Sequence, residues 1–196
     1  MQEGPHRDLM LRAIAREGDG HRAALAGDRD AASAAYREAA GLYRSSWELA
    51  PPSSYGRLVG MLKASVLAGE GADAAAYVRA QLTAEADGEA SPPAAYALAV
   101  AALIDGDDRA AAGFAAAMRA GPEPFGRAAD AIEALAAADA PAYRAAIDAI
   151  VADFAAREEH RTGVRIADTA AMLEALAGPR GLVAGAGGPL LPAAPL

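Results

Sequence analysis

The amino-acid sequence predicts an all-α protein made of stacked antiparallel helical hairpins. Alanine, the best helix-forming residue, makes up about three residues in ten. Aromatic residues are only 5% of the chain, and Val and Ile are sparse, so strands are poorly supplied. A sequence pattern at 51–55 also returns at 92–96. Together these observations favour eight to nine helices joined by short turns.

The repeated pattern opens with Pro-Pro and closes on a tyrosine in both copies. An Ala-Ala-Tyr triplet ending at Tyr36 returns at Tyr77 with the same offset. A fixed period of this size is typical of hairpins that bury their apolar faces by stacking on one another. We therefore expect Tyr55 and Tyr96 to be equivalent, and likewise Tyr36 and Tyr77. The later intervals, from Tyr77 to Phe114 and from Tyr96 to Phe125, are shorter, so the repeat is irregular.

Turn residues and Pro divide the chain into helix-length segments. One expected break is at 18–20. Within the acidic run at 105–108, Asp107 or Asp108 is expected to cap the helix that follows the run. The segments are 6–17 or 6–26, 30–49, 53–68, 72–86, 93–104, 108–120, 124–138, 141–158 and 165–177.

Apolar residues in the clearer segments recur with the 3.6-residue period of a helix. In the second segment, Tyr36, Tyr43 and Trp47 share one face. The third has its apolar residues at i, i+3, i+4, i+7 and i+11, starting at Tyr55. The later segments carry similar residues, including Tyr77 and Leu82; Val100 and Leu103; Phe114 and Met118; Ile132 and Leu135; Ile147 and Ile150; and Leu173 and Leu176.

The segments form a single helical-repeat domain over residues 1–178, followed by a Gly/Pro-rich tail over 179–196. Gly and Pro prevent a regular helix in this tail. Two alternatives remain open for it: it packs over the last hairpin through Leu190 and Leu191, or it is disordered.

Composition excludes several classes of protein. The net charge is −8 with dispersed arginines, which argues against a nucleic-acid partner. There is no cysteine, so disulfides, thiol catalysis and cysteine-bound metals are excluded. No apolar run reaches the ~20 residues of a membrane span, and the first residues do not resemble a signal peptide. We therefore expect a soluble, cytoplasmic protein; one lysine against seventeen arginines suggests a high-GC bacterial genome.

No motif predicts a catalytic residue, a cofactor or a metal ion. His-x-x-x-His spacing is absent, and the acidic run at 105–108 lacks the ligand spacing of an EF-hand. The glycines at 185–188 lack the strand, helix and Gly-Lys-Ser/Thr ending of a phosphate-binding loop. Neither is there a Gly-x-Ser-x-Gly nucleophile motif.

Two groups remain as candidate binding residues. Tyr43 and Trp47 could line a pocket, although a buried helix–helix contact would explain the same spacing. Glu158, Glu159 and His160 could form an acid–base or anion-binding corner. The alternative for this second group is a charged helix end, where His160 complements the helix dipole.

Residues 26–40, with Ala-Gly-Asp followed by Ala-Ala-Tyr, resemble the second helix of a tetratricopeptide-type repeat. Residues 69–77 and 106–114 look like variants, and the resemblance covers roughly residues 8–155. The interval between the repeated tyrosines is longer than the roughly 34 residues usual in that family. The family's Trp-Leu-Gly signature is also missing. The resemblance implies a TPR-like α-solenoid with a concave surface for a protein or peptide.

The C-terminal order of a helix ending near 157–160, a helix over 168–176 and a Pro-Leu-Leu-Pro segment resembles the end of some helical immunity proteins of bacterial polymorphic toxin systems. That resemblance implies neutralisation of a cognate toxin. The acidic charge would suit a basic toxin through electrostatic steering.

The sequence thus favours a non-catalytic, protein-binding module, with an immunity protein as the particular form. Two alternatives stay open: a structural or regulatory homo-oligomer such as a homodimer, and an enzyme or small-molecule binder with a site between hairpins. A dry inner groove without convergent polar groups would argue against the last of these.

Overall fold

The computed structural model describes residues 4–86 and 88–193, and these residues confirm the all-α prediction. Their α-helices are α1 (Pro5–Leu25), α2 (Arg29–Glu48), α3 (Gly56–Leu67), α4 (Gly71–Gln81), α5 (Thr83–Ala86), α6 (Pro92–Asp105), α7 (Asp108–Met118), α8 (Glu123–Ala136), α9 (Ala140–Ala156) and α10 (Asp168–Ala177). A 3₁₀ turn, η1 (Gly178–Arg180), follows α10.

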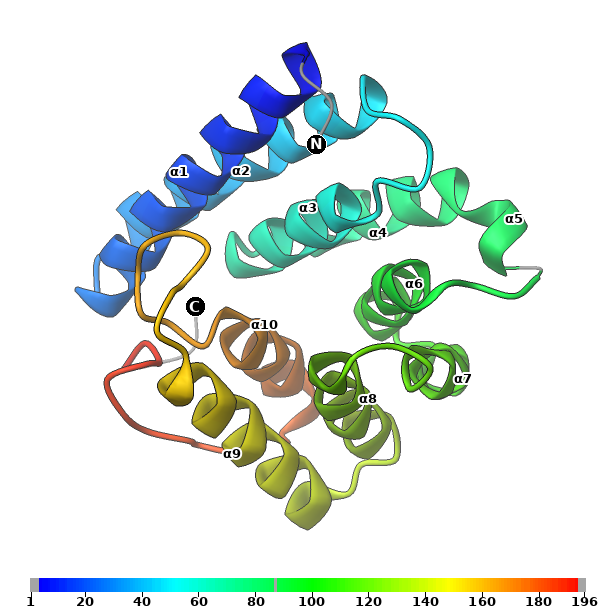
Figure 1. Cartoon of the computed structure of the whole chain (residues 1–196). Coiled ribbons are helices and arrows are strands. Elements are labelled where there is room, and N and C mark those ends of the chain that lie inside the picture. The colour runs from blue at the N-terminus through cyan, green and yellow to red at the C-terminus, as the bar shows by residue number, and fades with distance from the viewer. Residues whose placement is uncertain (1–3, 87, 194–196) are drawn as a thin grey trace.

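The helices form an arch of consecutive hairpins, with α10 enclosed on its inner side (Figure 1). The order of contacts is α1 with α2, α2 with α3, α3 with α4, α4 with α6, and then α6 through α9 in sequence. α10 contacts α3, α8 and α9, which belong to distant parts of the arch. The inner face that an open solenoid would offer to a partner is therefore occupied by the chain's own C-terminal helix.

Three helices begin at an aspartate that caps them. Asp28, Asp107 and Asp139 precede α2, α7 and α9, and each carboxylate accepts a hydrogen bond from the backbone N–H three residues on. Such caps satisfy N–H groups that have no partner within the helix. The prediction that the acidic run at 105–108 serves as a helix cap is confirmed.

The predicted helix boundaries differ from the structure in three places. α1 continues through the expected break at 18–20. The prolines at 51–52 lie in a turn, and α3 begins only at Gly56. The predicted segment 72–86 is divided between α4 and α5, so the described residues hold one helix more than the upper expectation of nine.

Neither pair of tyrosines expected to be equivalent has the same surroundings: Tyr36 is fully buried and Tyr77 only half-buried, and Tyr55 and Tyr96 differ as well. Tyr55 is half-buried just before α3 and stacks on Trp47, with 6.1 Å between ring centroids. Tyr96 lies inside α6, is 7% exposed and meets Phe125 edge-to-face. The difference arises because α6 starts at its Pro-Pro pair and α3 starts after its own. The repeated pattern therefore indicates hairpin stacking without giving each copy the same packing.

The C-terminal tail packs on the domain over its described residues. Leu190 and Leu191 are buried, and the backbone N–H of Ala167 donates to the carbonyl of Leu190 at 2.9 Å. Of the two alternatives, packing through these leucines is confirmed. The tail thereby covers the start of α10.

Among the described residues, no helix is both long enough and apolar enough to cross a membrane.

Gly20 lies within α1 at a point where α1 packs so closely on α2 that a side chain would not fit. A Cβ at Gly20 would lie 2.7 Å from the ring of Tyr36, which is fully buried. We expect Gly20→Ala to lower the free energy of unfolding by about 1–3 kcal/mol because the ring has to shift. Gly41, in the middle of α2, has nothing within 4 Å of such a Cβ.

Gly41→Ala is therefore the matched control, and its better helix propensity should raise the free energy of unfolding by about 0.5–1 kcal/mol. Urea denaturation of both variants measures the two effects. Equal changes of the same sign would contradict the close-packing explanation.

Candidate functional site

A cluster of ionisable side chains lies inside the arch, between the N-terminal helices and the C-terminal segment. Glu17 and His21 come from α1, Tyr43 from α2, and Lys63 from α3. Arg161 comes from the loop after α9, and Asp168 is the first residue of α10. We call these six residues the polar cluster. Apart from Arg161, its members are buried.

Glu17 is fully buried, with no exposed surface. The Tyr43 hydroxyl donates to Glu17 Oε2 at 2.6 Å, and the Arg161 guanidinium donates to the same oxygen. Arg161 also donates to the Tyr43 hydroxyl at 2.8 Å. The Arg161 side chain is 39% exposed, so this group reaches from the core to the surface.

Lys63 and Asp168 form a buried ion pair, with 2.9 Å between Nζ and Oδ2. A further link to the C-terminal part of the chain is the 3.0 Å contact between His21 Nδ1 and Thr162 Oγ1. These contacts connect residues that lie in the first third of the sequence with residues near its end. They hold the 157–168 segment and α10 against the inner side of the arch.

Burial and neighbouring charges shift the pKa values in opposite directions. Burial lowers the pKa of His21 to about 4, so its imidazole is neutral at pH 7. Burial raises the pKa of Glu17, against the opposing effect of Arg161. For Asp168 burial acts to raise the pKa, but Lys63 outweighs it and lowers the pKa to about 2. The cluster thus holds two carboxyl groups, two cations and a neutral imidazole.

Two neighbouring hollows share Phe154, Arg157 and Thr169 as a common wall, and residues of the polar cluster line the second of them. The first has a volume of about 100 Å³, and the second about 200 Å³. We refer to the two together as the inner hollow. The second hollow is lined by His21, Lys63, Phe154, Arg157, His160, Arg161, Thr162, Val164, Ile166, Asp168 and Thr169.

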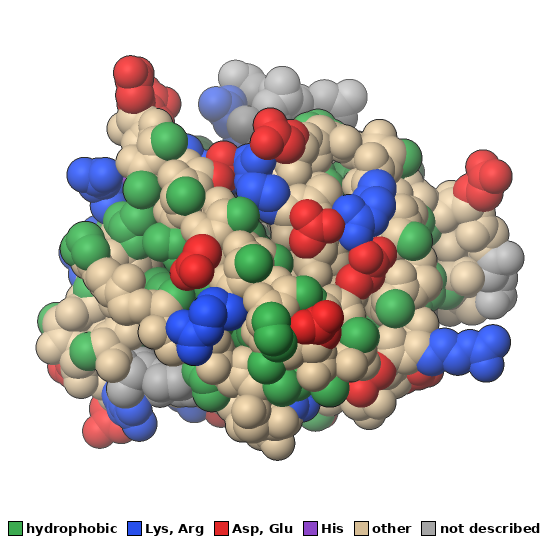
Figure 2. All heavy atoms as spheres, turned by 90° about the horizontal axis from the view of Figure 1, so that it is seen from below, with side chains coloured by type: hydrophobic (Ala, Val, Ile, Leu, Met, Phe, Trp, Pro, Cys, Tyr) green, Lys and Arg blue, Asp and Glu red, His purple; other side chains and the backbone are tan. Residues whose placement is uncertain are grey.

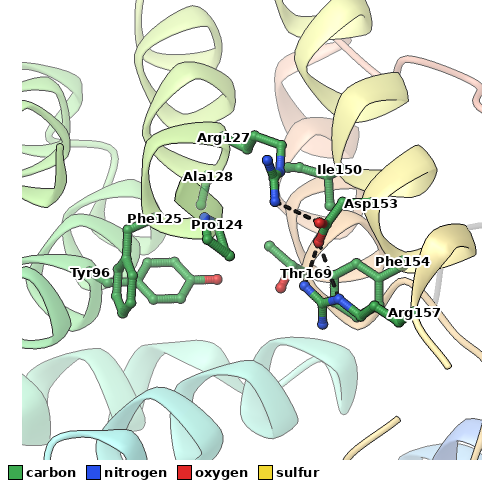
Figure 3. Close-up of a pocket in the computed structure, with 10 residues that line it drawn as sticks. All are labelled: Tyr96, Pro124, Phe125, Arg127, Ala128, Ile150, Asp153, Phe154, Arg157 and Thr169. Atoms are coloured by element: carbon green, nitrogen blue, oxygen red, sulfur yellow. Dashed lines mark hydrogen bonds and ion pairs between the residues drawn. The ribbon is translucent and has the colours of Figure 1, made fainter. Parts of the chain in front are cut away.

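Figure 3 shows the first hollow, where the Tyr96 hydroxyl points inward from α6. On the opposite wall Asp153 is held between two arginines: Arg127 donates to Oδ1 at 2.6 Å, and Arg157 donates to Oδ2. The Arg157 guanidinium also lies over the Phe154 ring, 3.7 Å from its centroid. These contacts orient both arginines before any ligand arrives.

Cationic side chains and their carboxylate partners line the inner hollow of this acidic protein. Four cationic side chains line it: Lys63, Arg127, Arg157 and Arg161. Three carboxylates on the inner side of the arch pair with these four cations: Asp168, Asp153 and Glu17. A further partner of Arg127, Glu123, is exposed to solvent. Cationic N–H donors and the hydroxyls of Thr162 and Thr169 thus converge on the hollow.

The residues singled out from the sequence are distributed over separate places. Tyr43 belongs to the polar cluster, and His160 is half-buried and lines the inner hollow. Trp47 makes other contacts: it stacks on Tyr55, and its Nε1 donates to Gln81 at 3.1 Å. Glu158 and Glu159 are exposed in the loop after α9. Because α9 ends at Ala156, this charged group does not form a helix end.

Sequence reasoning missed most of the polar cluster. Glu17 and His21 are four residues apart, a spacing that places two side chains on one face of a helix. The four-residue spacing is visible in the sequence, but a helix break at 18–20 would place Glu17 and His21 in different segments. Lys63, Arg161 and Asp168 carry no local motif, since only the fold brings them to α1.

The fold and this site define an all-α helical-array protein with a polar hollow at its centre. Comparison with protein-family models, curated proteins and solved structures finds no match to this chain.

Proposed function

We propose that the protein binds a small anion, bearing a carboxylate or phosphate group, in the inner hollow. The observation that carries this proposal is the set of four cationic side chains around a hollow whose inner carboxylates number three. Convergent polar groups of this kind favour the small-molecule alternative over an array with a dry inner groove.

Arg157 and Arg161 are the residues best placed to meet the anion. Their side chains are 36% and 39% exposed, so each can reach a ligand entering from solvent. A guanidinium has five N–H donors, and the contacts of each arginine with its carboxylate leave others free to bind an anion. Lys63 and the hydroxyls of Thr162 and Thr169 supply further donors deeper in the hollow.

Thermal unfolding with increasing acetate, sulfate or inorganic phosphate tests this proposal, with sodium chloride at matched ionic strength as the reference. A ligand that binds only the folded state stabilises it by about 1.4 kcal/mol for each tenfold rise in concentration above its Kd. We expect Arg157→Gln to reduce this stabilisation, because it removes a charged donor from the hollow while leaving the helix intact.

Arg144→Gln is the matched control, since Arg144 is an exposed arginine of α9, the helix that Arg157 directly follows, and it does not line the hollow. It should leave the anion effect unchanged. If all salts stabilise the protein equally, or if the two variants behave alike, the inner hollow is not an anion site.

A protein partner stays a prediction, and so does its particular form, a basic toxin. With α10 inside the arch, a partner would have to use the outer surface. On the face seen in Figure 2, acidic and basic side chains are interspersed among apolar ones and no single sign dominates. That distribution gives no support to a concentrated acidic docking surface on this face.

A further inference from the structure

We propose that Glu17, His21 and Asp168 bind a divalent transition-metal ion of the Zn²⁺ type beside the inner hollow. One ligand atom from each residue lies within 4.8 Å of the ligand atoms of the other two. The three side chains are 0%, 1% and 8% exposed, so water has little access to them. Two come from one face of α1 and the third from the start of α10, so two separate elements converge on a common point.

Two of the ligand residues have polar atoms that are buried without a hydrogen-bond partner among the described residues. These atoms are Glu17 Oε1 and His21 Nε2. Leaving a buried polar group unpaired typically costs about 1–3 kcal/mol, so such atoms are rare in folded proteins. A metal ion coordinated by both atoms would explain why neither has a hydrogen-bond partner.

The surrounding contacts leave the coordinating atoms available. Thr162 Oγ1 can accept a hydrogen bond from His21 Nδ1–H, which leaves the lone pair of Nε2 free for a metal ion. Glu17 Oε2 is held by Tyr43 and Arg161, so Oε1 remains. Asp168 Oδ2 is held by Lys63, and its Oδ1 has only a 3.4 Å contact with Thr169.

The ligand types indicate which ions fit. One imidazole nitrogen and two carboxylate oxygens suit Zn²⁺ and its transition-metal neighbours. Ca²⁺ requires six to eight oxygen ligands, and this cluster does not provide them. Three protein ligands leave a coordination position open, as in zinc sites that bind a water or substrate.

Charge determines when the ion binds well. Lys63 and Arg161 already neutralise the two carboxylates, so a divalent cation adds positive charge to a buried site. An anion in the inner hollow would offset that charge. We therefore expect the ion and the anion to increase each other's affinity, as linkage requires. This coupling rests on the proposed function, whereas the three-ligand site itself does not.

The experiment is calorimetric titration of chelator-treated, full-length protein with Zn²⁺, and with Co²⁺ followed by visible absorption. We expect one ion per chain and tighter binding when sulfate is present. Glu17→Gln and His21→Gln should weaken binding by more than the roughly 10- to 100-fold that loss of a supporting contact costs.

The matched controls are Glu174→Gln and His6→Gln, which replace a buried glutamate and a buried histidine outside the cluster. These two variants should bind the ion as the unmodified protein does. If they lose as much affinity as the cluster variants, or if no ion binds with or without sulfate, the metal site is refuted.

A second measurement does not depend on the cluster variants folding. The chain has three histidines, and ¹⁵N NMR of their side chains should show Zn²⁺ shifting Nε2 of His21 alone. A shift confined to His6 or His160 would overturn the proposal. Ion binding that sulfate leaves unchanged would count against the anion proposal and leave the three-ligand site standing.

Discussion

Replacing Lys63 with methionine is expected to lower the free energy of unfolding by about 3–5 kcal/mol, the usual cost of breaking a buried ion pair. Lys63 and Asp168 are 2.9 Å apart, and their side chains are 10% and 11% exposed. Without Lys63, the Asp168 carboxylate has no full counter-charge in the core. Urea denaturation at pH 7 measures the loss.

Two further variants make this result specific. Arg37 and Glu70 form an exposed pair, so Arg37→Met should cost only about 0–1 kcal/mol. The double variant Lys63→Met with Asp168→Asn removes both charges and should be more stable than Lys63→Met alone. A double variant whose loss equals the sum of the two single losses would show that the pair does not act as a unit.

The effect of Lys63→Met should also depend on pH. In the unmodified protein the pKa of Asp168 is lowered to about 2. The ionised carboxylate therefore stabilises the folded state at pH values above the pKa that Asp168 has in the unfolded chain. This stabilisation is lost as pH falls toward 2. Without Lys63, burial is left as the main influence on this carboxyl and raises its pKa. The variant then gains stability as the carboxyl takes up a proton. The difference between the two proteins should therefore shrink as pH falls from 7 to 4.

Replacing Glu174 with alanine is expected to lower the free energy of unfolding by about 2–4 kcal/mol and to release the C-terminal tail, because hydrogen bonds to a charged group contribute about 1.5–3 kcal/mol each. Glu174 is a buried residue of α10 whose two carboxylate oxygens accept the backbone N–H groups of Ala184 at 2.9 Å and Gly185 at 3.1 Å. Hydrogen exchange at these two amides reports the release directly.

The control is Glu38→Ala, which removes an exposed glutamate paired with Arg16 and should change stability by less than about 0.5 kcal/mol. Glu174→Gln keeps one acceptor oxygen, so its loss should be intermediate. Unchanged exchange at Ala184 and Gly185 in Glu174→Ala would mean that the buried leucines of the tail suffice to hold it.

Much of the fold could be predicted because helix formation depends on local signals. Alanine content, the 3.6-residue period and capping aspartates such as Asp107 act within a few residues along the chain. The spacing of the aromatic residues in α2 also predicts a shared face, and Tyr36 and Tyr43 on that face are fully buried. Of the two alternatives for the first segment, the structure has the longer one, 6–26, and Gly20 lies inside the helix where the Tyr36 ring packs closely against it.

The site could be predicted only in part. The spacing of Glu17 and His21 was available in the sequence, but its meaning depends on Asp168, near the other end of the chain. The spacing in α2 predicts Tyr43 to be a pocket or core aromatic, but the role of its hydroxyl depends on Glu17 and Arg161. Lys63 is the only lysine of the chain, and nothing in its neighbourhood of the sequence indicates a buried ion pair.

The sequence by itself determined the helical class and the stacking of hairpins, because helix propensity and apolar periodicity act over one or two turns. Only the tertiary structure decided that α10 occupies the inner side of the arch and that the tail is held by Glu174. It also decided that ionisable residues from five separate segments meet in one cluster. Burial and charge pairing are properties of groups that come together in space, and their energies depend on partners that no local pattern specifies.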